Sequence, residues 1–171
     1  RGHSERMVKY VTHIGKNLGM AKQELKDLEM AAILHDVGKL GIDKSVFLKP
    51  GKLTPEEYEV IKKHSTIGAN ILSRVRFLKG SAEYVKHHHE RWDGNGYPDK
   101  LKGMDIPLGA RILAVVDSFD AMMSVRPYKK AMTLEEAFAE LKRTSGAQFD
   151  PEIVEEFLNF DFKSDTINNH S

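Results

Sequence analysis

The chain of 171 residues is long enough for one domain with a sizeable core, and its 40% hydrophobic and 30% charged residues are typical of folded globular proteins. The 26 Lys and Arg and the 25 Asp and Glu give a net charge of +1, which argues against a broad surface for duplex nucleic acid. No apolar run approaches the roughly 18 residues of a membrane-spanning helix, so no membrane contact is expected from this segment.

The first part of the chain has the hydrophobic spacing of helices. One apolar stripe runs from Met7 to Leu18, and Gly19 follows as a stop signal. A second stripe runs from Leu25 to His35 and ends before Gly38. These two patterns predict a pair of amphipathic helices.

The third helix has a clear start. Thr54, Pro55 and Glu57 have the pattern of an N-cap, a first-turn proline and an acidic first turn. Further helices are expected at four places: about 81–90, about 107–124, after Thr133 and after Asp150. Because alternating strand patterns are scarce, the sequence predicts an all-α bundle of about seven helices.

Two long irregular stretches, about 38–53 and 91–106, lie next to histidines, and long loops in compact helical domains are usually functional or mobile. The domain is expected to cover residues 1–162, with 163–171 as a flexible C-terminal tail that has little to bury. The chain opens at Arg1 in a helix-like pattern, so we expect it to be part of a longer protein with an upstream regulatory domain.

Helical periodicity indicates where the histidines point. His3 stands four residues before Met7 and is therefore expected on the inner face of the first helix. His35 falls on the apolar face that carries Ala32, and Asp36 flanks the same face. The sequence therefore places two histidines and one carboxylate against the core.

The later histidines follow the same rule. His64 shares a face with the apolar positions between Val60 and Ile71. His88 and His89 are three and four residues after Val85, so they form the inward pair of the triplet. His13 and His87 are expected to be ordinary residues of the helix surface.

Asp117 lies in an apolar run, where a lone carboxylate is costly unless it is paired, protonated or bound to a metal. A partner such as Arg111 is one alternative, and a single inward histidine is more often a hydrogen-bonded core residue than a ligand. However, five inward histidines and two carboxylates would each need a separate partner under that interpretation. One shared metal centre satisfies all of them, and we prefer it.

The ligand types indicate a reaction. The chain has no cysteine, so a metal must be bound through nitrogen and oxygen, and imidazole with carboxylate suits ions such as Mn, Fe, Zn, Ni or Co. Seven candidate ligands exceed the needs of one ion, and paired ions activate water and stabilise phosphoryl transfer. Lys39, Arg126 and Lys129 are candidate cations for contacting a phosphate, and solvated charges beside loops are the alternative.

Two motifs resemble a known family. The segment LHDVGKLGI at 34–42 is similar to the signature of the HD superfamily of metal-dependent phosphohydrolases. The segment HHERWDGNGYP at 88–98 is similar to the second signature of its HD-GYP branch. The similarity extends from GHSERM at 2–7 to FDPEIV at 149–154, and the GYP stretch is the specific part of it.

The resemblance implies a set of site residues. The implied metal ligands are His3, His35, Asp36, His64, His88, His89 and Asp117. Asp36 would bridge two divalent ions, with Fe or Mn expected, and some relatives hold a third ion. Asp36 and Lys39 would be catalytic, and the implied phosphate contacts are Lys39, Arg126 and Lys129.

The GYP loop carries a second implication of the resemblance. Its residues Asp93, Gly94, Gly96, Tyr97 and Pro98 match a loop that borders the active site and is implicated in contacts with diguanylate cyclase (GGDEF) domains. An ordinary Asn-Gly turn describes the same backbone equally well. Both interpretations stay open.

The function implied is that of a bacterial cytoplasmic phosphodiesterase. It would hydrolyse cyclic di-GMP to linear pGpG, and further to GMP in a second cut, through a metal-bridging hydroxide. One alternative is a hydrolase of another cyclic dinucleotide such as cyclic GMP-AMP. The other is a module that senses cyclic di-GMP or docks a partner without significant turnover.

Overall fold

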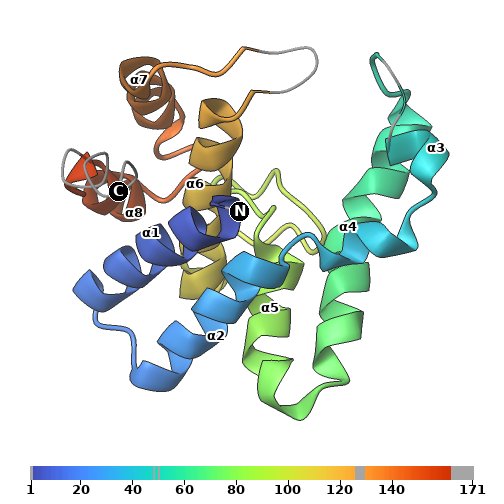
Figure 1. Ribbon diagram of the computed structural model, residues 1–171, viewed down its shortest axis with the longest axis horizontal. Helices are drawn as coiled ribbons and strands as arrows, with labels where there is room; N and C mark the ends of the chain where they lie inside the picture. The colour runs from blue at the N-terminus through green and yellow to red at the C-terminus, as the bar shows by residue number, and fades with distance from the viewer. Residues whose placement is uncertain (1, 48, 50, 126–129, 163–171) are drawn as a thin grey trace.

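The computed structural model describes residues 2–47, 49, 51–125 and 130–162, and within these ranges the regular structure is helical (Figure 1). The α-helices are α1 (His3–Asn17), α2 (Lys22–Leu34), α3 (Lys44–Phe47), α4 (Pro55–Ser73), α5 (Lys79–His87), α6 (Leu108–Met123), α7 (Leu134–Thr144) and α8 (Pro151–Leu158). Short 3-10 helices are η1 (Val37–Gly41), η2 (Arg76–Leu78) and η3 (Gly103–Asp105). The predicted all-α fold is confirmed, and the short α3 accounts for the additional helix.

Helix α6 is the centre of the fold. Its residues Ile112, Leu113, Val115 and Val116 have no exposed surface, so the helix is apolar on nearly all sides, as a buried helix must be. Helices α1, α2, α5, α7 and α8 all pack against it (Figure 1). No helix in the described residues is both long and apolar enough to cross a membrane.

Helix α4 meets its neighbours through small residues. Ser65, Gly68 and Ala69 are buried, whereas Ile71 is 40% exposed, so the expected apolar stripe through Ile71 was wrong. The reason is the close approach of η1, where a Cβ on Gly38 would lie 1.8 Å from the backbone oxygen of His64. This backbone contact brings the end of α2 and the middle of α4 together.

The predicted helix starts are confirmed. Thr54 accepts a hydrogen bond from the backbone N–H of Glu57, and Thr133 accepts one from that of Glu136. Asp150 caps α8 by accepting the N–H of Glu152 at 3.0 Å. Side-chain caps therefore define the first turns of these helices.

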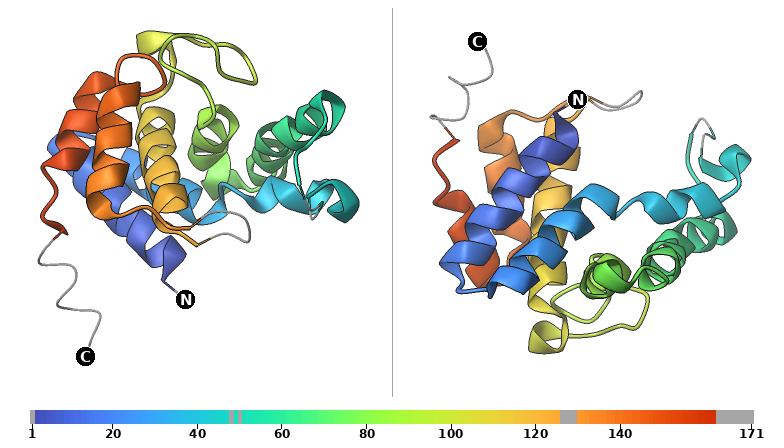
Figure 2. Two further views of the ribbon diagram at one scale, coloured as in Figure 1. Left: turned by 90° about the horizontal axis from the view of Figure 1, so that it is seen from above. Right: turned by 60° about the horizontal axis from the view of Figure 1, so that its bottom comes forward.

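The loop of residues 91–106 lies beside α5 and α6 (Figure 2). It is attached to the turn before α8, since the N–H of Trp92 donates to the Gln148 carbonyl at 3.1 Å and that of Asp93 to the Ala147 carbonyl at 2.9 Å. A buried ion pair holds the same region to α6, with Arg111 Nη1 2.6 Å from Asp150 Oδ2. Arg111 therefore pairs with Asp150 and not with Asp117, the partner considered for it.

Because Asp150 both caps α8 and neutralises buried Arg111, Asp150→Ala is expected to lower the free energy of unfolding by about 3–5 kcal/mol. Thr133→Ala, the matched removal of an exposed cap from α7, should lower it by about 1 kcal/mol. Urea denaturation followed by circular dichroism measures both. Equal losses of unfolding free energy in the two variants would show that the ion pair of Arg111 with Asp150 adds no stability beyond the helix cap.

Candidate metal centre

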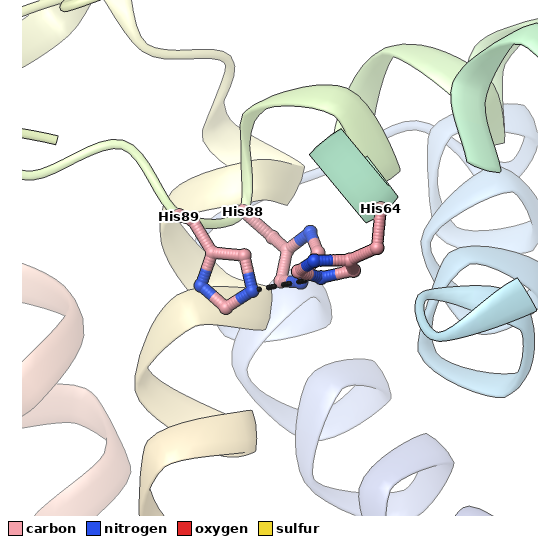
Figure 3. A group of neighbouring side chains, drawn as sticks. All are labelled: His64, His88 and His89. Carbon is pink, nitrogen blue, oxygen red and sulfur yellow. Dashed lines mark hydrogen bonds between the residues drawn. The ribbon is translucent and has the colours of Figure 1, made fainter. Parts of the chain in front are cut away.

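Three histidines form the densest group of candidate ligands in the described residues. His64 comes from α4, His88 is the C-cap of α5, and His89 is the next residue (Figure 3). One ring nitrogen from each lies within 4.8 Å of the other two, and their rings converge on one point. His64 Nε2 and His89 Nε2 are 3.1 Å apart.

Backbone carbonyls fix the orientation of three imidazoles. His35 Nδ1 donates to the Ala32 carbonyl at 2.9 Å. His64 Nδ1 donates to the Ile61 carbonyl and His88 Nδ1 to the Val85 carbonyl, both at 2.7 Å. His35 and His88 end helices, where carbonyls lack an intrahelical partner and are free to accept. A proton on Nδ1 leaves a lone pair on Nε2, the arrangement that metal-binding histidines use.

His88 provides the direct test of this arrangement. Its side chain is 1% exposed, and Nε2 is buried with no hydrogen-bond partner in the described structure. Buried polar atoms without a partner are rare because they lose their hydration without compensation. An ion bound at Nε2 would supply the missing interaction, so the residues fit a metal.

Carboxylates complete the group across one cavity. His35 Nε2 is 3.5 Å from Asp117 Oδ1 and 3.7 Å from Asp36 Oδ2. A cavity of about 390 Å³ is lined by these three residues together with His64 and His89. Six of the seven predicted ligands therefore line one cavity, since His3 also belongs to its lining, and the seventh, His88, lies against the neighbouring cavity.

The surroundings favour the protonation states that metal binding needs. Burial, reinforced by the other histidines, lowers the pKa of His89 to about 2, and burial lowers that of His88 to about 4 and shifts that of His64 downward. Burial would raise the pKa of Asp117, but neighbouring His35 outweighs it and lowers the pKa. Burial would also lower the pKa of His35, but Asp117 and Asp36 outweigh it and raise the pKa. His64, His88 and His89 therefore offer neutral imidazoles beside an ionised carboxylate.

His3 lines the cavity as expected, with its ring 6.1 Å from that of His35, but it is less buried than expected. Its side chain, in the first turn of α1, is 50% exposed. Its Nδ1 donates to Asp120 Oδ2 at 2.6 Å. Asp120 also pairs with Arg6 at 3.0 Å and is almost fully buried. Sequence analysis missed Asp120, although its position three residues after Asp117 places both on one face of α6.

His87 was also assigned wrongly, because it is 8% exposed and not a surface residue. Its ring lies 2.9 Å from Asp99 Oδ2, since the loop after α5 folds back over that side of the helix. It points away from the other histidines toward this loop. His13, in contrast, is partly exposed near Glu156, as expected for a surface residue.

The loop that carries the GYP residues is built onto the histidine cluster. Tyr97 stacks on His89 with ring centroids 4.9 Å apart and the rings inclined by 28°. A Cβ on Gly96 would lie 2.6 Å from the His89 carbonyl, so glycine permits this contact. Asp93 pairs with Arg91, and Glu90, which sequence analysis missed, accepts the N–H of Asp99 at 2.7 Å and so shapes the loop.

Of the three predicted phosphate contacts, Lys39 lies at the cavity, with Nζ 2.6 Å from Asp36 Oδ2. Arg126 and Lys129 lie outside the described residues. The other GYP positions, Gly94 and Pro98, sit in the loop, with Gly94 at a φ of 84° that favours glycine.

Comparison with known proteins identifies the family. The HD domain family matches residues 1–153, and the chain therefore belongs to it. The chain is 49% identical over 161 residues to a cyclic di-GMP phosphodiesterase of Thermotoga maritima, covering 93% of this chain and 44% of that protein. It is 49% identical over 156 residues to the cyclic di-GMP phosphodiesterase response regulator RpfG of Xanthomonas campestris pv. campestris, covering 90% and 41%.

A solved structure supports the same assignment. The cyclic GMP-AMP specific phosphodiesterase V-cGAP3 of Vibrio cholerae superposes with a TM-score of 0.71 at 26% identity, over 98% of this chain and 44% of that one. The chain thus spans less than half the length of these relatives. The resemblance to HD phosphodiesterases expected from the motifs is confirmed.

His88→Ala is expected to lower the affinity for Mn(II) or Fe(II) at least about tenfold, because it removes a preorganised buried ligand. His87→Gln is the matched control, since this neighbouring buried histidine points toward Asp99. Metal content after dialysis, measured by plasma mass spectrometry, compares the two variants. Equal retention of metal by His88→Ala and the unmodified chain would contradict the assignment.

Proposed function

We propose that this HD-domain chain is a metal-dependent phosphodiesterase that hydrolyses cyclic di-GMP to linear pGpG, with GMP as the product of a second cut. The observation that carries the proposal is the partnerless Nε2 of His88 at the centre of a histidine and carboxylate cluster beside an open cavity. Relatives named cyclic di-GMP phosphodiesterases, 49% identical over nearly the whole chain, support the substrate.

The ligand set we propose is His3, His35, Asp36, His64, His88, His89 and Asp117. Its composition would suit two divalent ions, which Asp36 would help to hold, and a third where further ligands are available. Nitrogen and oxygen donors without thiolate are compatible with Fe or Mn. His3 would need to exchange its contact with Asp120 for an ion, because that carboxylate now accepts its Nδ1 proton.

When bound, the ions would supply Lewis acidity, an activated water and stabilisation of charge on the reacting phosphate. The protein holds its imidazoles in place before any ligand arrives, through the Nδ1 bonds of His35, His64 and His88. Such preorganisation avoids a reorganisation cost during the reaction. Tyr97 covers one face of His89 and limits the access of water there.

Lys39 has the position of a phosphate-binding and charge-compensating residue. Its ammonium lies 2.6 Å from Asp36 at the cavity, where it would face a phosphate oxygen of the substrate. We propose Arg126 and Lys129 as further phosphate contacts because they belong to the RPYK segment at 126–129, which resembles the family. The departing 3′-oxygen would then take its proton from water or a lysine.

A different cyclic dinucleotide is the second candidate substrate. The specific observation is the similarity to a phosphodiesterase specific for cyclic GMP-AMP, which shares 26% identity and the fold. The metal ligands act on a phosphodiester that both cyclic dinucleotides contain. Discrimination between them must therefore come from groups that contact the bases.

The wider setting is part of the proposal. We take residues 1–162 as the catalytic domain of a longer protein, in line with relatives more than twice as long as the matched segment. A bacterial cytoplasmic location rests on the bacterial sources of these relatives. The GYP loop, with Asp99 and Asn95 exposed beside it, is the proposed contact for a diguanylate cyclase (GGDEF) domain.

Asp117→Asn is expected to reduce kcat/KM for cyclic di-GMP by at least about 100-fold, because the neutral amide no longer offers a charged ligand beside His35. Asp105→Asn makes the same change at an exposed position of η3 and should leave turnover intact. Chromatography of pGpG and GMP, with EDTA-treated protein as a blank, measures both. Undiminished turnover in Asp117→Asn would overturn the proposal.

A further inference from the structure

A second cavity opens on the other side of His89. It has a volume of about 360 Å³, within the range of small-molecule sites, and shares His89, Tyr97, Asp117 and Ser118 with the cavity that contains Lys39. A substrate whose phosphate lies at the histidine cluster can therefore extend into this space. The groups that line it determine which part of a substrate it accepts.

Part of the lining comes from the turn before α8. The backbone of Gln148 is fixed at both ends, since its N–H donates to the Thr144 carbonyl at 2.9 Å and its carbonyl accepts from Trp92. The adjoining Phe149 is buried and also lines the cavity. The ion pair of Arg111 with Asp150 holds this turn against α6, so the position of Gln148 is set in advance.

The cavity is polar and aromatic, and the carboxylates of Glu90 and Asp117 line it beside His88 and His89. Gln148 and Ser118 both line the cavity, and neither side chain makes a hydrogen bond within the described residues. Tyr58 and Tyr97 contribute aromatic rings. The charge of Arg91 is balanced by Asp93, to which it donates at 2.7 and 3.1 Å.

These groups match a heteroaromatic base better than a phosphate. Aromatic side chains stack on bases, and a glutamine amide offers a donor and an acceptor side by side to a base edge. A phosphate would instead require cations. A separate groove of about 420 Å³ beside Tyr97 and Pro98 offers such cations, because Lys62, Lys63 and Lys100 line it.

We propose that the cavity between Gln148, Ser118 and Tyr58 is a purine-base subsite that positions the cyclic dinucleotide at the histidine cluster. This inference rests on the proposed function and names the part of its substrate that the protein reads. Gln148 is the main hydrogen-bonding residue, and Tyr58 provides a stacking wall. Because both contact the base and not the reacting phosphate, they act on binding more than on the chemical step.

The test compares two substrates, cyclic di-GMP and bis(4-nitrophenyl) phosphate, a phosphodiester without a base. Gln148→Leu removes the amide at similar size, and Gln23→Leu makes the same change at an exposed position of α2 as the matched control. For Gln148→Leu we expect KM for cyclic di-GMP to rise about tenfold with kcat nearly unchanged. Hydrolysis of bis(4-nitrophenyl) phosphate should stay at the level of the unmodified chain.

A second variant tests the subsite independently, in case Gln148→Leu disturbs the local fold. Tyr58 is 49% exposed on α4, so Tyr58→Leu should fold normally and should also raise KM for cyclic di-GMP about tenfold by loss of stacking. Unchanged KM in both variants would overturn the subsite while leaving the phosphodiesterase intact. If the unmodified, metal-loaded chain hydrolysed neither substrate, the proposed function itself would fail.

Discussion

The site depends on one repeated interaction, the hydrogen bond from histidine Nδ1 to the carbonyl three residues earlier. His35, His64 and His88 all make it, at 2.7–2.9 Å. Each bond selects one tautomer and aims the other nitrogen at a common region. Without these bonds, the buried imidazoles would be free to rotate. Burial, and not these bonds, favours the neutral form, since it lowers the pKa of His88 to about 4.

Close packing of the helices brings the Nε2 atoms of these histidines to the same region. Gly38 lets η1 touch the backbone of α4, which brings Asp36 and Lys39 toward His64. Buried α6 presents Asp117 from the opposite side, and the loop after α5 closes over His89 through Tyr97. The proposed ligands come from segments far apart in sequence, so they meet only in the folded domain.

Local signals in the sequence were enough for the framework. Capping patterns at Thr54 and Thr133 located helix starts, and helical periodicity placed His64 and His88 inward. Errors arose where tertiary contacts decide exposure. His87 is covered by a loop that returns to it through Asp99, and His3 stays half exposed in the first turn of α1 while it contacts Asp120. Periodicity within a single helix could determine neither exposure.

The most direct test of the central claim is anomalous diffraction from crystals of the Mn(II)-loaded protein, which locates the ions without reference to activity. The account predicts an anomalous peak about 2 Å from His88 Nε2, with His64 and His89 beside it and a carboxylate of Asp36 or Asp117 within reach. A peak at Nδ1, at the exposed carboxylates alone, or none near His88 would contradict the account.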